Sequence, residues 1–126
     1  MKKLFIIFSV IVLQSCDNFT PKPDEVGDLL IRIENATSTE MQNVYVNTAG
    51  GEGSYGDVPK NEKSHYINYK SAYRYAFVRF VSRNDTVRVQ PIDYVGEQQL
   101  TSGSYTYKIT MTNKNSDFAN IELTKD

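Results

Sequence analysis

Few residues of this sequence have side chains that commonly carry out chemistry, and their spacing limits what that chemistry can be. The chain contains one histidine, His65, and one cysteine, Cys16. A hydrolase would have to combine His65 with a carboxylate such as Asp93 or Glu97, which lie in the stretch PIDYVGEQQ. No serine stands in a G-x-S-x-G motif, and no neighbouring motif supports catalysis. We therefore expect no enzymatic activity and no catalytic residue, with a small hydrolase that uses His65 and Asp93 or Glu97 as an alternative.

The patterns that hold common cofactors and metals are also missing. The stretch GEGSYG, residues 51–56, matches G-x-G-x-x-G, but phosphate binding by this motif requires a helix immediately after it. The following DVPKNEKS contains Pro59 and no helical pattern, so we expect a glycine-rich loop between strands. A zinc site would depend on carboxylates, and the aspartates do not follow the spacing of a calcium loop. The sequence predicts neither a cofactor nor a metal site.

The single cysteine stands where an apolar run ends, in KKLFIIFSVIVLQSC. Two lysines precede Leu4–Leu13, as in a secretory signal peptide, and the run is too short for the roughly 20 residues that span a bilayer. The residues Leu13–Cys16 resemble the lipobox of bacterial lipoproteins. This resemblance implies cleavage before Cys16 by signal peptidase II, diacylglycerol on the sulfur, and acylation of the new amino group. Acyl chains of this kind would anchor the protein to a membrane without crossing it.

These features predict three segments. Residues 1–15 are the signal peptide, residues 16–27 are the lipidated N-terminus with a proline-bearing tether, and residues 28–126 form one domain. Removal of residues 1–15, which carry two lysines and no acidic residue, changes the formal net charge from −1 to −3. A mildly acidic protein without a basic face is not expected to bind nucleic acid. We expect it in the cell envelope, on the inner or the outer membrane, facing the periplasm or the exterior.

The domain shows a hydrophobic period of two rather than of three and a half. Leu29, Ile31 and Ile33 alternate with Arg32 and Glu34, and β-branched and aromatic residues dominate the other runs. Seven such runs, separated by turn-forming residues, lie at 29–35, 43–47, 64–70, 72–82, 86–90, 103–112 and 118–124. This pattern predicts an all-β fold, an antiparallel β-sandwich of about seven strands, with an incompletely closed barrel as the alternative.

One late strand carries a more specific motif. The stretch LTSGSYTYKI resembles the L-x-x-G-x-Y motif of many Ig-like and transthyretin-like sandwiches. The resemblance implies a bend at Gly103 and a tyrosine corner, in which the ring of Tyr105 packs inward and its hydroxyl bonds to upstream backbone. Both residues would then be structural. In overall plan the chain resembles the small Ig-like lipoproteins of Bacteroidota, a likeness that carries no assigned activity.

The stretch AYRYAFVRFV is apolar or aromatic on both of its expected faces, where a half-exposed strand would alternate with polar residues. One interpretation is a central strand that neighbouring residues cover. The other is an exposed patch of residue types that are common in binding hot spots. The candidate binding residues, for a protein or carbohydrate ligand, are Tyr73, Tyr75, Phe77 and Arg79.

We therefore expect a non-enzymatic, lipid-anchored binding or accessory module of the cell envelope. A further alternative is an inhibitor of a secreted enzyme, which would present the stretch AGGEGSYGD, residues 49–57, as a protruding loop.

Overall fold

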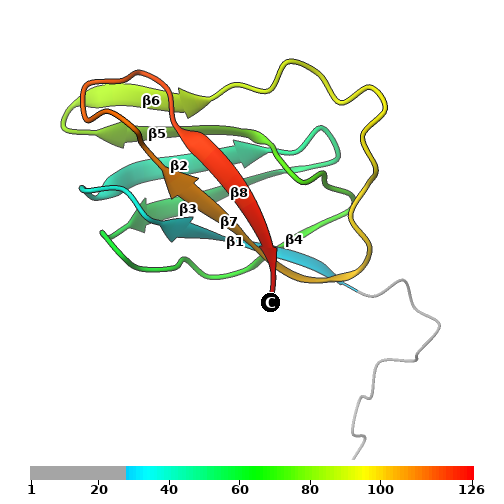
Figure 1. Ribbon diagram of the computed structural model, residues 1–126. Coiled ribbons are helices and arrows are strands. Elements are labelled where there is room, and N and C mark those ends of the chain that lie inside the picture. The colour runs from blue at the N-terminus through cyan, green and yellow to red at the C-terminus, as the bar shows by residue number, and fades with distance from the viewer. Residues whose placement is uncertain (1–27) are drawn as a thin grey trace, which may run out of the picture.

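The computed structural model describes residues 28–126, which fold into two four-stranded sheets packed face to face (Figure 1). The first sheet has the order β4 (Ile67–Tyr69), β1 (Leu29–Asn35), β7 (Gly103–Thr110), β8 (Asn120–Lys125). The second has the order β3 (Glu52–Val58), β2 (Met41–Asn47), β5 (Phe77–Ser82), β6 (Asp85–Val89). The predicted all-β sandwich is confirmed, with eight strands. In the part of the chain that the structure describes, no helix is long and apolar enough to span a membrane.

The core lies between the sheets and is built from the alternating residues of the strands. In β1, Leu29, Ile31 and Ile33 are buried, and in β7 the buried positions include Tyr107 and Ile109, as their spacing predicts. Each such side chain contributes about 1.5–3 kcal/mol when it is removed from water. The other sheet adds Val44, Val46, Val78, Phe80 and Val87. Unlike the remaining strand pairs, β1 and β7 run parallel.

Strand β3 corrects the expectation of a glycine-rich loop at residues 51–56. The segment Glu52–Val58 pairs along β2, and Tyr55 and Val58 point into the core. At Gly53 a strand needs a glycine because a neighbouring side chain approaches the backbone closely, and at Gly56 because the backbone has a positive φ. A Cβ atom on Gly53 would lie 2.6 Å from the hydroxyl of Tyr69, and the φ of +70° at Gly56 accompanies an irregularity in the pairing with β2. The apparent dinucleotide motif is therefore a strand at the edge of a sheet.

Strand β5 begins later than the sequence suggests, at Phe77 rather than at Ala72. The residues before Phe77 do not continue the strand because their carbonyl groups accept hydrogen bonds from strand β7 and from the segment that leads into it. The carbonyl of Ala72 accepts a hydrogen bond from the N–H of Leu100 at 2.8 Å, and the carbonyl of Tyr73 accepts one from the hydroxyl of Tyr107. These carbonyls are used outside the second sheet, so Tyr73 and Tyr75 are in a connection and not in a strand.

A buried polar residue fixes the turn between β1 and β2. The side chain of Asn35 has no exposed surface and makes four hydrogen bonds. Its amide nitrogen donates to the carbonyls of Thr39 at 2.8 Å and Val58 at 2.9 Å. Its amide oxygen accepts from the N–H of Thr37 at 2.9 Å and from the hydroxyl of the same residue at 2.6 Å. The turn is thereby tied to the end of β3.

Candidate functional site: a cleft between beta6 and beta8

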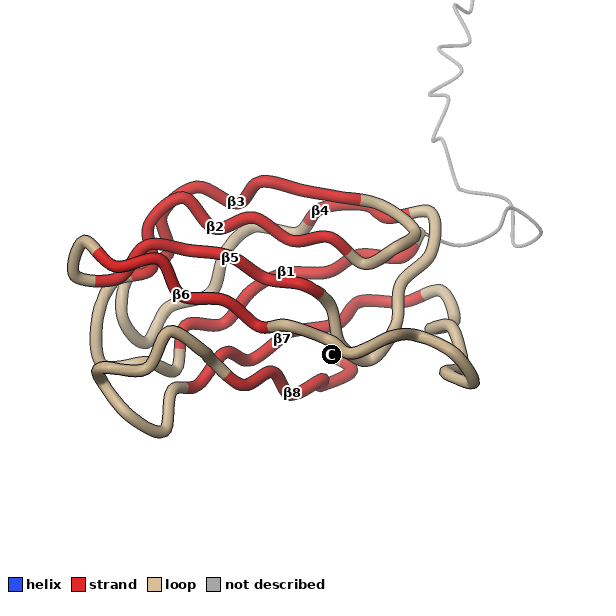
Figure 2. The backbone as a smooth tube through the Cα atoms, turned by 90° about the horizontal axis from the view of Figure 1, so that it is seen from above, coloured by secondary structure: helices blue, strands red, loops and turns tan. Residues whose placement is uncertain are grey.

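Strands β6 and β8 are edge strands of different sheets and lie on the same side of the sandwich (Figure 2). They touch at one point, where the N–H of Arg88 donates to the carbonyl of Asp117 at 3.0 Å and the N–H of Ala119 donates to the carbonyl of Arg88 at 2.9 Å. Beyond this point the two strands diverge (Figure 1). A cleft of about 1100 Å³ lies between the connection that follows β6 and strand β8.

Three large apolar side chains on this cleft are exposed to solvent. Ile92 is 100% exposed, Val95 is 88% exposed and Phe118 is 59% exposed. Among residues 28–126, these are the large apolar side chains with the greatest exposure, and all three line the same cleft. Exposed apolar residues that gather at a concave site are typical of a binding surface.

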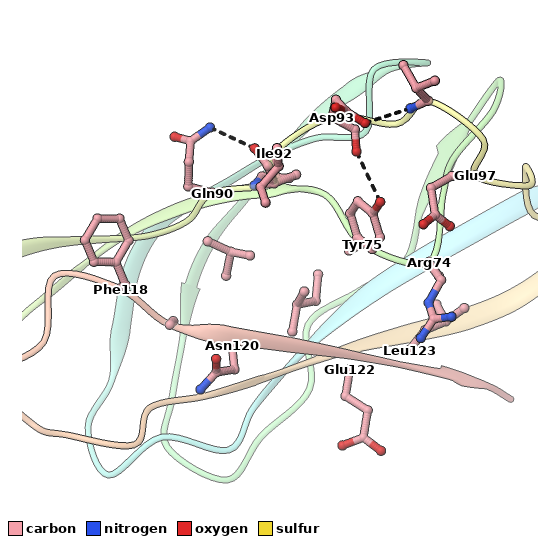
Figure 3. A pocket seen from close by; sticks show the side chains of 15 residues that line it. Arg74, Tyr75, Gln90, Ile92, Asp93, Glu97, Phe118, Asn120, Glu122 and Leu123 are labelled. Atoms are coloured by element: carbon pink, nitrogen blue, oxygen red, sulfur yellow. Dashed lines mark hydrogen bonds between the residues drawn. The ribbon is translucent and has the colours of Figure 1, made fainter.

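The floor of the cleft is continuous with the core. Val89 and Ala119 are nearly buried, and Ile121 and Leu123 of β8 are partly buried against the core. The side chains of Asn120 and Glu122 point away from the cleft (Figure 3). The divergence of the two edge strands therefore leaves part of the core reachable from one side.

Charged side chains lie toward one end of the cleft, whereas the amide of Gln90 lies nearer Ile92 and Phe118 (Figure 3). Arg74, Tyr75 and Glu97 lie at the end opposite Phe118, and Asp93 lies above them (Figure 3). The cleft thus combines apolar walls with two carboxylates and one guanidinium, which suits a ligand that is apolar for most of its length and cationic at one point.

A stack of tyrosine rings positions the connection after β6. The ring of Tyr94 stacks on Tyr73 with centroids 4.7 Å apart and on Tyr75 with centroids 5.6 Å apart. The hydroxyl of Tyr75 donates to the carbonyl of Asp93 at 3.1 Å. Desolvation, and then the carboxylate of Glu97, raise the pKa of Tyr75.

The four candidate binding residues from the sequence fall into two separate places. Tyr75 lines the cleft, and Tyr73 supports it through the stack with Tyr94. Phe77 and Arg79 lie instead on the outer face of the second sheet, beside Tyr45. There the rings of Tyr45 and Phe77 meet edge to face at 6.4 Å, and the guanidinium of Arg79 lies 5.1 Å from the centroid of the Tyr45 ring. The structure does not bring the four together as one patch.

The two residues singled out as structural have the geometry that the sequence motif implies. The ring of Tyr105 is 4% exposed, and its hydroxyl donates to the carbonyl of Thr101 at 2.9 Å. Gly103 has a φ of +143°, a conformation that residues with a Cβ atom rarely adopt. These two residues shape the entry into β7.

His65 is placed apart from the two carboxylates with which a hydrolase would combine it. Its ring lies 5.6 Å from that of Tyr55, in the connection between β3 and β4, whereas Asp93 and Glu97 line the cleft and His65 does not. In the described residues, no three histidine, cysteine, aspartate or glutamate side chains form a group that could hold a metal ion. The segment 49–57, considered above as an inhibitory loop, is for most of its length strand β3.

Lipidation of Cys16, the signal peptide and the tether concern residues outside the described part of the chain, and they remain predictions.

Sequence reasoning missed Ile92, Val95 and Phe118. The signal was present for the first two, because the stretch PIDYVGEQQ is a polar crossover that nevertheless contains isolated large apolar residues. Phe118 could not be separated from an ordinary strand residue, because it stands next to the alternating residues of β8. Only the fold brings it opposite Ile92.

The comparisons with known proteins bear on the fold. The sequence matches no protein-family model and no curated protein. The structure is similar to the NMR structure of a protein from Eubacterium rectale, with a TM-score of 0.57 and 14% sequence identity. The alignment covers 79% of this chain and 93% of that one. At this level of identity the similarity shows a shared β-sandwich fold and nothing about function.

Proposed function

We propose that this protein is a non-enzymatic, lipid-anchored binding module of the bacterial cell envelope, with the cleft between β6 and β8 as its ligand site. The observation that carries the proposal is the convergence of Ile92, Val95 and Phe118 on one cleft at the open side of the sandwich. Leaving three large apolar side chains in water contributes nothing to folding, whereas a ligand that covers them gains about 1.5–3 kcal/mol for each.

The anchor is the second part of the proposal. It rests on the lipobox-like residues Leu13–Cys16 and the apolar run before them. The finer relationship that we propose, to the small Ig-like lipoproteins of Bacteroidota, rests on the same residues and on the sandwich. A lipid on Cys16 would anchor the protein through its N-terminus to the inner or the outer membrane, on the periplasmic or the exterior side.

The anchor is tested by intact-mass spectrometry of the protein purified from its own cells. The proposal requires loss of residues 1–15 and added acyl mass on the N-terminal peptide. An unmodified cysteine thiol, or an N-terminus that still carries the leader, would remove this part of the proposal.

The site is tested by photo-crosslinking in intact cells. A photoreactive benzoylphenylalanine replaces Phe118, and in a control protein it replaces Lys60, an exposed residue that follows the opposite edge strand β3. We expect a discrete adduct from position 118 and none from position 60. Equal labelling from both positions, or labelling from neither, would contradict a ligand site in the cleft.

A further inference from the structure

We infer that the cleft accepts an extended polypeptide segment of a partner protein, which adds as a strand to the free edge of β8. This inference rests on the proposed function and specifies the partner and its mode of binding. Its elements are the edge of β8, with which no other strand of residues 28–126 pairs, a blocked edge on β6, apolar side chains that would cover an added strand, and the charges at one end of the cleft.

The direction of the backbone groups in β8 follows from the hydrogen bonds at its two ends. The N–H of Ala119 is directed toward Arg88 of β6, and the N–H of Asp126 donates to the carbonyl of Ser104 on β7. Along a strand, successive residues direct their N–H and C=O groups to alternate sides, and the pairing of β8 with β7 is regular. The backbone groups of Ile121 and Leu123 are therefore directed away from β7, toward the cleft.

Strand β6 is the poorer of the two walls for pairing. Arg88 already uses its outward N–H and C=O groups in the contact with residues 117 and 119. Pro91, just after the end of β6, has no N–H group, and proline at a sheet edge prevents further pairing. An added strand would consequently pair with β8 and leave β6 as a side wall.

The cleft also supplies places for the side chains of an added strand. Alternate side chains of an extended segment point to the same face, so every second residue would lie on the partly buried Ile121 and Leu123. Ile92 and Val95 belong to the connection that follows β6 and line the same cleft, where their exposed side chains could cover the added strand. This arrangement requires apolar residues at alternate positions of the partner segment, as in other cases of strand addition.

The charges favour a basic residue at one end of that segment. The lining of the cleft includes the carboxylates of Asp93 and Glu97 and the single guanidinium of Arg74 (Figure 3). A lysine or arginine of the partner would balance the excess negative charge and fix the register of the added strand. Carbohydrate would leave Ile92 and Val95 in contact with hydroxyl groups, so the exposed aliphatic residues favour a peptide.

The test uses the full-length protein, labelled with ¹⁵N in detergent micelles, and a phage-displayed library of random peptides of about eight residues, somewhat longer than a typical strand. Selected peptides are synthesised, and backbone amide exchange is measured with and without each one. At about 100 times the Kd of the peptide, exchange at Ile121 and Leu123 should slow by about 100-fold. Asn120 and Glu122, whose N–H groups are directed toward β7, are bonded without the peptide and should therefore exchange more slowly than Ile121 and Leu123 before it is added.

Matched variants separate the contribution of the backbone to peptide binding from that of the side chain. Leu123→Ala and Leu123→Pro both remove the leucine, but only the proline also removes the edge N–H. Because that N–H lies on the free edge, we expect both variants to unfold at similar urea concentrations, and the proline variant to bind the peptide about fivefold or more weakly than the alanine variant. Equal affinities of two folded variants would overturn strand addition. If the proline variant does not fold, the amide exchange of Ile121 and Leu123 in the parent protein tests strand addition instead.

The outcomes distinguish this inference from the proposed function. Peptides that shift the resonances of Ile92 and Phe118 but leave Ile121 and Leu123 unprotected would overturn strand addition and retain the cleft as a ligand site. The same holds if no peptide binds while the photo-adduct from position 118 is present in cells. Peptides that map only to other surfaces would overturn the inference, and with no adduct at position 118 they would also overturn the proposed function.

Discussion

Replacement of Asn35 tests how the sandwich is held together at the end of β1. The side chain is fully buried and makes four hydrogen bonds to the turn between β1 and β2 and to the end of β3. With about 0.5–1.5 kcal/mol for each bond, Asn35→Ala should lower the free energy of unfolding by about 2–6 kcal/mol. The free energy is measured by urea unfolding of the full-length protein, followed by circular dichroism. Ser38→Ala in the same turn is the control and should change it by less than about 0.5 kcal/mol, because that side chain is exposed.

A second variant at this position, Asn35→Asp, tests how the free energy of unfolding depends on pH. Asn35→Asp keeps an acceptor for Thr37 but replaces the amide donor that faces the carbonyls of Thr39 and Val58. A carboxylate there is destabilised, so its pKa in the folded state is raised and the folded state takes up a proton as pH falls. The loss of stability relative to the parent protein should therefore be smaller at about pH 4.5 than at about pH 7, two values that both lie above the pKa of an unfolded carboxyl, about 3.9. A cost below about 1 kcal/mol for Asn35→Ala, or no pH dependence for Asn35→Asp, would refute the hydrogen-bond account of this turn.

Three further substitutions test other parts of the fold by the same unfolding measurement. Gly53→Ala should lower the free energy of unfolding by about 1–3 kcal/mol, because the new Cβ atom would lie 2.6 Å from the hydroxyl of Tyr69. An unchanged free energy of unfolding would show that β3 and β4 can move apart. Tyr105→Phe should lower the free energy of unfolding by about 0.5–1.5 kcal/mol, because the hydrogen bond to the carbonyl of Thr101 is lost. An unchanged free energy of unfolding would show that the bend at Gly103 does not depend on this bond. Burial opposes ionisation of Asp126, but hydrogen bonds from a tyrosine and a threonine and the charge of an arginine lower its pKa overall. Its contribution to stability is therefore complete above the pKa of an unfolded carboxyl, about 3.9, and is lost as pH falls through the lowered folded value. Asp126→Asn should remove that part of the acid sensitivity, and an unaltered acid profile would contradict the assignment.

The strands that the sequence predicts well are those in which side-chain chemistry alternates. In β1 and β7 one face is buried and the other is polar, so the period of two can be read directly from residues such as Ile31, Ile33 and Tyr107. Strand β3 could not be found in this way, because Gly51, Gly53 and Gly56 are turn-forming residues in isolation. The positions of Gly51 and Gly53 make sense only once the side chain of Tyr69 is placed against them, and that of Gly56 only once its positive φ is known.

The candidate site was less predictable than the fold, for a related reason. The sequence identified aromatic residues before and within β5, but the bend after Ala72 separates Tyr75 from Phe77 and Arg79. That bend depends on a bond from the hydroxyl of Tyr107, which is 34 positions away from Tyr73. The cleft itself arises because two edge strands of different sheets diverge, and no local pattern encodes this relation.

The most direct test of the account concerns Ile92 and Val95. In the parent protein the side chains of Ile92 and Val95 are 100% and 88% exposed. The double variant Ile92→Ser, Val95→Ser should therefore unfold at the same urea midpoint as the parent protein. The measurement is the yield of the photo-adduct from position 118 in cells that carry this double variant, relative to the parent protein. Because covering each side chain is worth about 1.5–3 kcal/mol to a ligand, we predict that the yield falls by about tenfold or more. An undiminished adduct in a stably folded double variant would contradict the claim that this cleft is where the protein binds.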